Sequence, residues 1–313
     1  MPGFVTHYIF GCENITKIEN KHIKESVKKH KAVYALGLQG PDLFFFSPFS
    51  FTGKRKRLGS IMHIYNTGEF LENLSIEVEK RRGEERKIAL AYFAGFLGHY
   101  FLDTNCHPYI YYATGYLDKS EPYIGKHVDF ETDIDMLILG RYKNKDVMNF
   151  NYSKIVGLNR DEINVVGHIL NRACKKSYPD IMTNNIMMMV SIVQYRIAYS
   201  QLRDKKGYKS SIIKKIEDRI FGHPKVSPLL VVEDKNSRWR DPLNLDKRKW
   251  LNPWDETLQS NYSFIELMEK AGDCYRKILN EVIDDTGSIR YNEVKEKLSN
   301  NSYHSGLDCS IPS

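Results

Sequence analysis

Residues 91–112 have the sequence AYFAGFLGHYFLDTNCHPYIYY, an apolar stretch that carries His99, Asp103 and His107 at intervals of four residues. At 3.6 residues per turn, these three side chains project from one face of a helix across two turns. Imidazole and carboxylate groups on a buried face are costly unless they are paired or coordinated. The stretch therefore predicts a buried helix with one edge of metal ligands, for which zinc is the ordinary partner.

Five more residues of ligand type lie in apolar or aromatic surroundings: His7, Asp42, His63, His127 and Glu131. A single histidine on an apolar face is usually a hydrogen-bonded core residue, but the eight residues together favour a metal centre. One tetrahedral zinc needs only four ligands. Two metals about 3.5–4 Å apart can instead share a bridging carboxylate and activate water for attack on phosphate esters. Asp103, between His99 and His107, is the expected bridge.

The other histidines are expected to lie outside this centre, since they sit among lysines or lack a partner at helical spacing: His22, His30, His168, His223 and His304. The five cysteines are widely spaced and form no CxxC pair, so neither a disulfide framework nor a thiolate site is expected. Cys106 immediately precedes His107, and on a helix its side chain points about 100° away from that of His107. We expect Cys106 to be a core residue.

Five motifs occur in order along the first half of the chain: GFVTH, GPD, SIMH, GHYFLDTNCHP and HVDFE. Together they resemble the zinc-dependent phospholipase C family, which includes secreted bacterial phospholipases C and the catalytic domain of glycosylphosphatidylinositol-specific phospholipase D. The resemblance covers about residues 2–135. It implies an all-helical domain with three zinc ions in a cleft.

The resemblance also implies a distribution of ligands over the three zinc ions. The three sets are Asp42, His63, His99 and Asp103; His7 with the bridging Asp103; and His107, His127 and Glu131. The family's proposed base or water-orienting carboxylate corresponds to Asp42. We therefore expect catalytic roles for Asp42 and Asp103.

The start of the chain differs from that of secreted members, in which signal cleavage exposes a residue whose amine completes a zinc shell. MPGFVTHYIF lacks a basic region and a continuous apolar region, so no signal peptide is expected. Proline at position 2 permits removal of Met1, which would leave the amine of Pro2 as a ligand. A frayed end, with water completing the shell, is an equal alternative.

Helical periodicity predicts an all-α chain that forms a single domain over residues 1–313. The resemblance implies that this domain is of the phospholipase C and single-strand-specific zinc nuclease type. The expected helices span residues 15–36, 58–82, 85–110, 126–142, 160–177, 181–204, 208–221 and 260–284. Residues 223–258 contain prolines that break helices, and we expect this segment to wrap the helical body. Its three tryptophans, Trp239, Trp250 and Trp254, predict that it packs there.

Charge and hydropathy restrict the ligand and the location. No apolar stretch reaches the roughly 20 residues that span a bilayer, so a cytoplasmic protein is expected. The net charge of +7 favours an anionic ligand such as phospholipid, nucleotide or nucleic acid. Residues 44–57, FFFSPFSFTGKRKR, place phenylalanines beside a basic run. This loop could touch a membrane surface or line the cleft mouth, whereas Phe44, Phe45 and Phe46 are expected in the core.

We therefore expect a metal-dependent phosphodiester hydrolase of the phospholipase C type, with two to three Zn²⁺ ions per chain and a phospholipid substrate. A zinc-dependent nuclease or nucleotidase of the same fold is the first alternative. A non-catalytic zinc-binding or lipid-binding protein is the second. Iron or manganese could replace zinc, because a mixed set of histidines and carboxylates binds all three metals.

Overall fold

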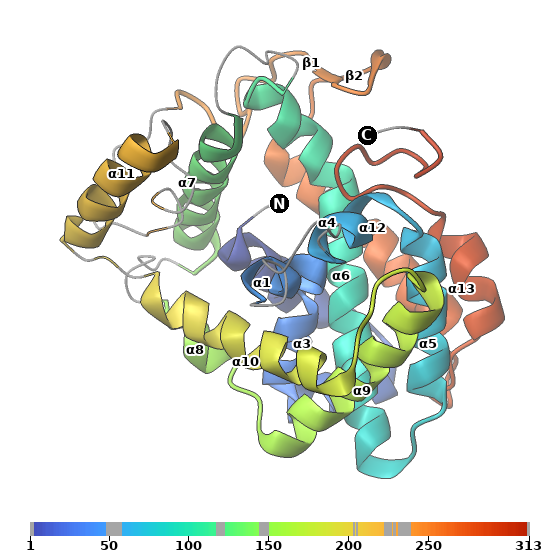
Figure 1. The fold of residues 1–313 in the computed structure, drawn as a ribbon. Helices are drawn as coiled ribbons and strands as arrows, with labels where there is room; N and C mark the ends of the chain where they lie inside the picture. Colours follow the sequence, from blue (N-terminus) through green and yellow to red (C-terminus); the bar gives the residue numbers. More distant parts are fainter. Residues whose placement is uncertain are drawn as a thin grey trace.

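The computed structural model describes residues 3–47, 58–116, 123–143, 150–202, 204, 206–221, 227, 230 and 239–311. These residues form α-helices, a short 3₁₀ helix and one two-stranded antiparallel sheet, which confirms the predicted all-α class (Figure 1). In chain order the elements are α1 (Phe4–Ile15), α2 (Lys21–Lys29), α3 (Lys31–Gly37), η1 (Gly40–Phe46), α4 (Leu58–Ile64), α5 (Thr67–Glu79), α6 (Gly83–Ala113), α7 (Tyr123–Lys143), α8 (Tyr152–Ile155), α9 (Arg160–Ser177), α10 (Asn185–Gln201), α11 (Tyr208–Phe221), β1 (Trp250–Asn252), β2 (Asp255–Ser260), α12 (Phe264–Val282) and α13 (Tyr291–Leu298). None of the described helices is long and apolar enough to span a membrane.

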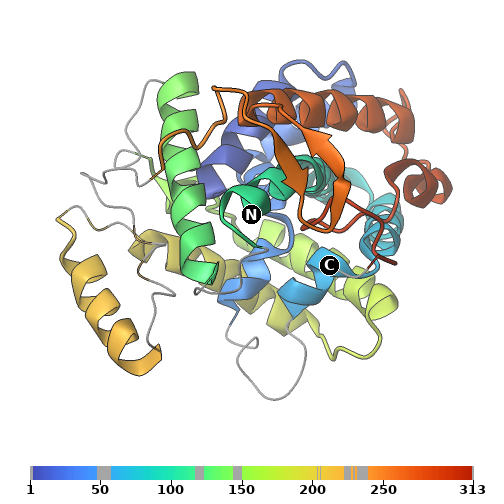
Figure 2. The same cartoon turned by 90° about the horizontal axis from the view of Figure 1, so that it is seen from above.

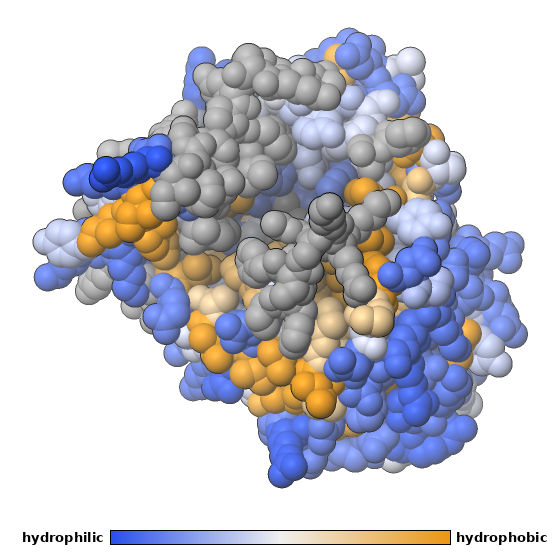
Figure 3. Space-filling view, in the orientation of Figure 1, coloured by the Kyte–Doolittle hydropathy of each residue, from blue (hydrophilic) through white to orange (hydrophobic). Residues whose placement is uncertain are grey.

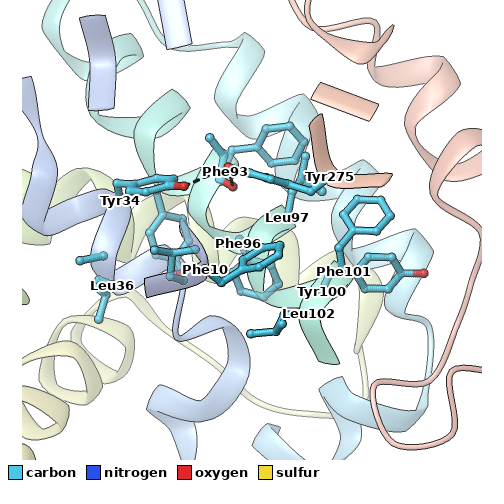
Figure 4. Packing of buried hydrophobic residues seen from close by; sticks show 14 of the residues in the cluster. Phe10, Tyr34, Leu36, Phe93, Phe96, Leu97, Tyr100, Phe101, Leu102 and Tyr275 are labelled. Atoms are coloured by element: carbon cyan, nitrogen blue, oxygen red, sulfur yellow. Dashed lines mark hydrogen bonds between the residues drawn. The ribbon is translucent and has the colours of Figure 1, made fainter. Parts of the chain in front are cut away.

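Helix α6 is the central element, and α1, α2, α3, α5, α9 and α12 all pack against it (Figures 1 and 2). Its residues from Ile88 to Asp103 are buried on every side, as expected for a helix that is apolar all round. Aromatic rings fill the space between α6 and its neighbours (Figure 4). The Tyr275 hydroxyl on α12 donates to the carbonyl of Ala94, and the Tyr34 hydroxyl on α3 donates to that of Gly11. These bonds hold α1, α3 and α12 in place around α6.

Helix α1 starts without a side-chain cap of its own, and Asp135 of α7 supplies one. The Asp135 carboxylate accepts hydrogen bonds from the backbone N–H of Val5 at 3.0 Å and of Thr6 at 2.8 Å. The Thr6 hydroxyl donates to it as well, at 2.6 Å. A carboxylate at a helix N-terminus satisfies unpaired N–H groups and favours the helix dipole. Asp135 therefore fixes the first turn of α1, which carries His7.

The predicted helix limits are confirmed for α9 and α11 but are wrong in the first part of the chain. The helix α1 was not expected, because its apolar residues lack a clear start signal. The predicted helix 15–36 breaks at His30, whose backbone leaves the helical region. The predicted helix 58–82 breaks at Asn66, which has φ of 51°. Both breaks turn the chain so that it can pack around α6.

The segment predicted to be irregular also contains structure that the sequence did not indicate. Strands β1 and β2 form a hairpin that begins within it and ends two residues beyond it, at Ser260. Trp250 is buried and Trp239 packs edge-on against Phe130 of α7, so the packing prediction is confirmed for both. After it, Ser263 caps α12 through a capping box with Glu266.

Candidate metal centre

The eight predicted ligands are all buried, and they meet where η1 and three helices converge around the second half of α6. They come from α1 (His7), η1 (Asp42), α4 (His63), α6 (His99, Asp103 and His107) and α7 (His127 and Glu131). Their ligand atoms form three groups, each within the span of one metal ion: His7, His99 and Asp103; Asp42, His63 and His99; and His107, His127 and Glu131. Pro2 lies outside the described residues.

Asp103 occupies the middle of the centre. Its Oδ1 atom lies 3.1 Å from Nε2 of His7, and its Oδ2 atom lies 3.1 Å from Nε2 of His99. Nδ1 of His107 is 3.6 Å from the same Oδ2. With one oxygen facing His7 and the other facing two residues of its own helix, the carboxylate has the position of a bridge.

Asp42 and His63 form a second group with His99. Nε2 of His63 lies 3.2 Å from Oδ1 of Asp42, and Nε2 of His99 lies 3.8 Å from the same oxygen. The turn into η1 requires Gly40, which has φ of +49° and packs so closely on His99 that a Cβ would collide with the ring. Burial lowers the pKa of His99, but the carboxylates of Asp103 and Asp42 outweigh this effect, so the pKa is raised.

The third group lies further along α6, toward its C-terminal end. Nε2 of His127 is 2.7 Å from Oε1 of Glu131, one turn along α7, and Nε2 of His107 is 3.7 Å from the same oxygen. The Tyr111 ring packs against both imidazoles, with centroid distances of 5.5 Å to His107 and 4.7 Å to His127. Trp254 packs on Tyr111 from the far side, at 4.8 Å. An aromatic wall therefore borders this group.

Backbone carbonyls orient three of the histidines. Nδ1 of His63 lies 2.6 Å from the carbonyl oxygen of Gly59. Nδ1 of His99 lies 3.1 Å from the carbonyl oxygen of Leu38, and Nδ1 of His107 lies 2.7 Å from that of Tyr303. A proton on Nδ1 satisfies each carbonyl and leaves the lone pair of Nε2 facing the centre. Metal-binding histidines are held in this way by outer hydrogen bonds.

Electrostatics lower the pKa of two candidate carboxylates and of three imidazoles, whereas the pKa of His99 is raised. Burial alone would raise the pKa of Asp103, but the imidazoles around it hold that pKa well below the usual range. His127 likewise lowers the pKa of Glu131 against the effect of burial. Burial lowers the pKa of His107 to about 4, and it also lowers the pKa of His7. Ionised carboxylates and neutral imidazoles are the forms that bind a metal ion.

The donor set fits zinc, and several buried donor atoms lack any hydrogen bond. Among the described residues, the buried ligand atoms without a hydrogen bond are both carboxylate oxygens of Asp103, both ring nitrogens of His7, and Nε2 of His99 and of His107. Buried polar atoms are normally satisfied, because leaving them unpaired costs about 1–3 kcal/mol each. A divalent cation bound by these nitrogen and oxygen atoms would remove the cost.

The last part of the chain contributes to the centre, which the sequence did not predict. We call residues 299–311 the C-terminal strap. The Tyr303 N–H donates to the carbonyl of His63 at 2.8 Å, while the Tyr303 carbonyl accepts from His107. The Tyr303 ring is fully buried against His63 and His99, with centroids at 5.2 and 5.6 Å. The strap therefore ties together ligands from α4 and α6.

His304 was expected to lie outside the centre; its ring borders the centre, and it belongs to none of the three ligand groups. Its half-buried ring lies 5.5 Å from the ring of His63, 6.2 Å from that of His107 and 5.3 Å from that of Tyr111, between centroids. Helical spacing could not reveal it, because the strap is irregular and lies almost 200 residues after His107. The only signal was a histidine beside a tyrosine in a polar tail.

Other predicted residues have mixed outcomes. Cys106 is fully buried in the core, as expected. Phe44 is also core, but Phe45 stacks on His63 with centroids 5.2 Å apart, so it borders the centre. The rest of the predicted membrane loop, residues 48–57, lies outside the described residues, as does His223.

The comparison with known proteins agrees with the geometry. The model of a family described as zinc dependent phospholipase C matches residues 5–189. This range contains all eight candidate ligands and ends within α10, before the C-terminal strap. Neither a curated protein nor a solved structure matches the chain.

Proposed function

The chain belongs to the zinc-dependent phospholipase C family, and from this premise we propose that it is a metal-dependent hydrolase that cleaves the head-group phosphodiester of a phospholipid. The observation that carries the proposal is the buried Asp103 carboxylate, which has both oxygens without a hydrogen bond and three imidazoles around it. Such a group serves no purpose in an ordinary helical core, whereas a shared carboxylate is typical of multi-metal phosphoesterases.

We assign the candidate ligands to the three sets that the resemblance implies: Asp42, His63, His99 and Asp103 would hold one zinc, His7 with Asp103 a second, and His107, His127 and Glu131 a third. The third set coincides with one group of neighbouring ligand atoms, whereas His99 lies within reach of both other groups. The amine of Pro2 is proposed to complete a shell, with water as the alternative. When bound, the zinc ions supply charge for the phosphoryl oxygens, lower the pKa of a water to about 7 and stabilise the leaving alkoxide.

The remaining chemistry belongs to the side chains of this chain. Asp42 is the candidate base or water-orienting group, because its carboxylate lies at the edge of the cluster and points toward His63 and His99. Asp103 neutralises charge at the centre and positions the groups on either side. Tyr111 and His304 border the cluster and are candidates for contacts with the phosphate or the head group.

Metal analysis and a substrate panel test this proposal. We expect two to three metal ions per chain in protein never exposed to a chelator. We also expect hydrolysis of phosphatidylcholine or phosphatidylinositol and of a chromogenic phosphodiester, with much slower cleavage of single-stranded DNA. One metal ion or none would contradict the cluster. Preferred cleavage of DNA would indicate a nuclease, and a filled centre without hydrolysis would indicate a non-catalytic protein.

A further inference from the structure

Helix α11 exposes an apolar stripe that no other part of the chain covers among the described residues. Tyr208, Ile212 and Ile216 are 68%, 60% and 51% exposed. At 100° per residue, their spacing of four places them within about 80° of one another on one face. Figures 1 and 2 show α11 standing at the periphery of the helical body. Exposed apolar patches on a stable protein mark interaction surfaces.

The orientation of α11 is fixed by its opposite face. Glu217 is buried there and accepts hydrogen bonds from the N–H of Ser227 at 3.1 Å and from its hydroxyl at 2.7 Å. The N–H of Ser210 donates to Asp204 at 2.6 Å on the same side. The apolar stripe therefore faces outward because polar groups hold the inner side.

Cations share the outward face with the apolar stripe. By helical angle, Lys209, Lys215 and Arg219 fall within about 60° of its centre, and all three are exposed. Asp218, the exposed acid of this helix, falls on the flank, about 120° from that centre. Apolar side chains interleaved with lysine and arginine are typical of a helix that lies in the interface of an anionic membrane.

Helix α10 carries a second exposed stripe on the face that points away from η1. Ile186, which is 71% exposed, lies on one helical face with the exposed Val193 and Ile197. The inner face of α10 holds η1, since the Ser191 hydroxyl donates to that of Ser47 at 2.8 Å. η1 carries Asp42, so the outer stripe of α10 and the metal centre lie on two sides of one packed unit.

Figure 3 shows apolar atoms over α10 and α11 on the same side of the molecule, with hydrophilic atoms beside them on α11. We propose that these outward faces of α10 and α11 form one docking surface for an anionic phospholipid bilayer. The inference rests on the proposed function, because it names the surface from which that function would draw its substrate. Positive charge among the apolar residues favours anionic lipid over an apolar protein partner or a second copy of the chain.

Vesicle binding by the full-length, metal-loaded protein tests the surface. We expect the wild type to bind phosphatidylglycerol-containing vesicles more tightly than pure phosphatidylcholine vesicles. The double variant Ile212→Asp with Ile216→Asp should bind at least about tenfold more weakly, since each loses apolar burial and gains a repelled charge. Its hydrolysis of the soluble chromogenic phosphodiester should match that of the wild type. Leu245→Asp, at a residue that is 56% exposed in another part of the molecule, is the matched control and should bind normally.

The basic residues give a second, independent measure. Replacing Lys209, Lys215 and Arg219 with glutamine should weaken binding to anionic vesicles by roughly fivefold per cation at low salt and leave binding to phosphatidylcholine unchanged. The inference is wrong if both sets of variants bind vesicles as the wild type does. It is also wrong if the aspartate variant only converts a dimer to a monomer in sedimentation, because the face would then bind a second copy. Binding that depends on these residues without hydrolysis of any lipid would overturn the proposed function and leave the surface standing.

Discussion

Two buried carboxylates, Glu77 on α5 and Asp103 on α6, have opposite surroundings. Glu77 is 1% exposed and faces cations of the chain itself, with Nζ of Lys80 at 2.7 Å and Nη1 of Arg172 at 3.6 Å. Asp103 is fully buried and faces imidazoles, without a lysine or arginine ion pair among the described residues. Glu77 is therefore compensated by the protein, whereas Asp103 needs a cation from outside.

The same difference separates two buried histidines. His30 lies between two carboxylates, with Nδ1 at 2.8 Å from Glu162 and Nε2 at 3.0 Å from Glu84. His7 is fully buried with neither ring nitrogen in hydrogen-bond geometry. Burial of a polar group thus does not by itself identify a functional site, whereas a cluster of buried ligand-type groups without partners, as at His7 and Asp103, points to a bound cation.

The largest expected effect comes from replacing the Asp103 carboxylate with an amide, and the same exchange at Glu77 is the comparison. Asp103→Asn should lower phosphodiester hydrolysis at least about a thousandfold, because charge and the bridge are lost together. It should also lose at least one metal ion, which elemental analysis will measure. Glu77→Gln should keep both metals and rate and lower the free energy of unfolding by about 1–3 kcal/mol. Full activity of Asp103→Asn would show that another residue forms the bridge.

A smaller effect is expected from moving the strap that orients two ligands. Gly306 has φ of +67°, and a Cβ there would collide with the carbonyl oxygen of Thr104 on α6. Gly306→Ala should displace Tyr303 from His107 and weaken metal binding by about 10–100-fold, the usual effect of losing an outer contact. Competition with a metal-sensitive dye measures this affinity. Gly140→Ala, where a Cβ meets nothing within 4 Å, is the control, and equal affinity in both variants would remove the strap from the metal centre.

His304→Ala should have a more selective effect, because the ring borders the cluster and belongs to none of the three ligand groups. We expect a fall of about tenfold in kcat/KM, as for loss of one hydrogen bond to a charged group, with metal content unchanged. His168→Ala should leave both quantities at the wild-type level. If His304→Ala instead loses metal, the residue acts on the centre and not on the substrate.

The most gradual expected effect is a loss of stability in mild acid. The pKa of His107 is lowered to about 4, so the unfolded chain binds more protons than the folded chain between about pH 6.5 and 4. Its contribution to stability is therefore complete above pH 6.5 and is lost as the pH falls toward 4, at up to about 1.4 kcal/mol per pH unit. Protons also compete for the ligands, so metal should be released over the same range. Thermal unfolding and metal content measured against pH will test this, and stability that is constant over the range would refute it.

Local periodicity was sufficient to predict the ligands that helices place one turn apart. His99, Asp103 and His107 are neighbours on α6, and His127 and Glu131 are neighbours on α7, because spacings of four residues bring side chains together in any α-helix. Apolar composition likewise predicted that α6 is buried. These features depend on residues close in sequence, so no knowledge of the packing was needed.

Tertiary packing alone decided which distant residues join this helix. The motifs suggested that His7 belongs to the centre, but its position depends on the cap that Asp135 provides from α7. Nothing in the sequence predicted that Tyr303 would orient His107 or that His304 would lie beside His63. The same holds for His30, which sits among lysines in the sequence and is buried between two carboxylates. Such contacts join irregular segments to helices across more than a hundred residues, and only the packing of whole elements around α6 brings their atoms together.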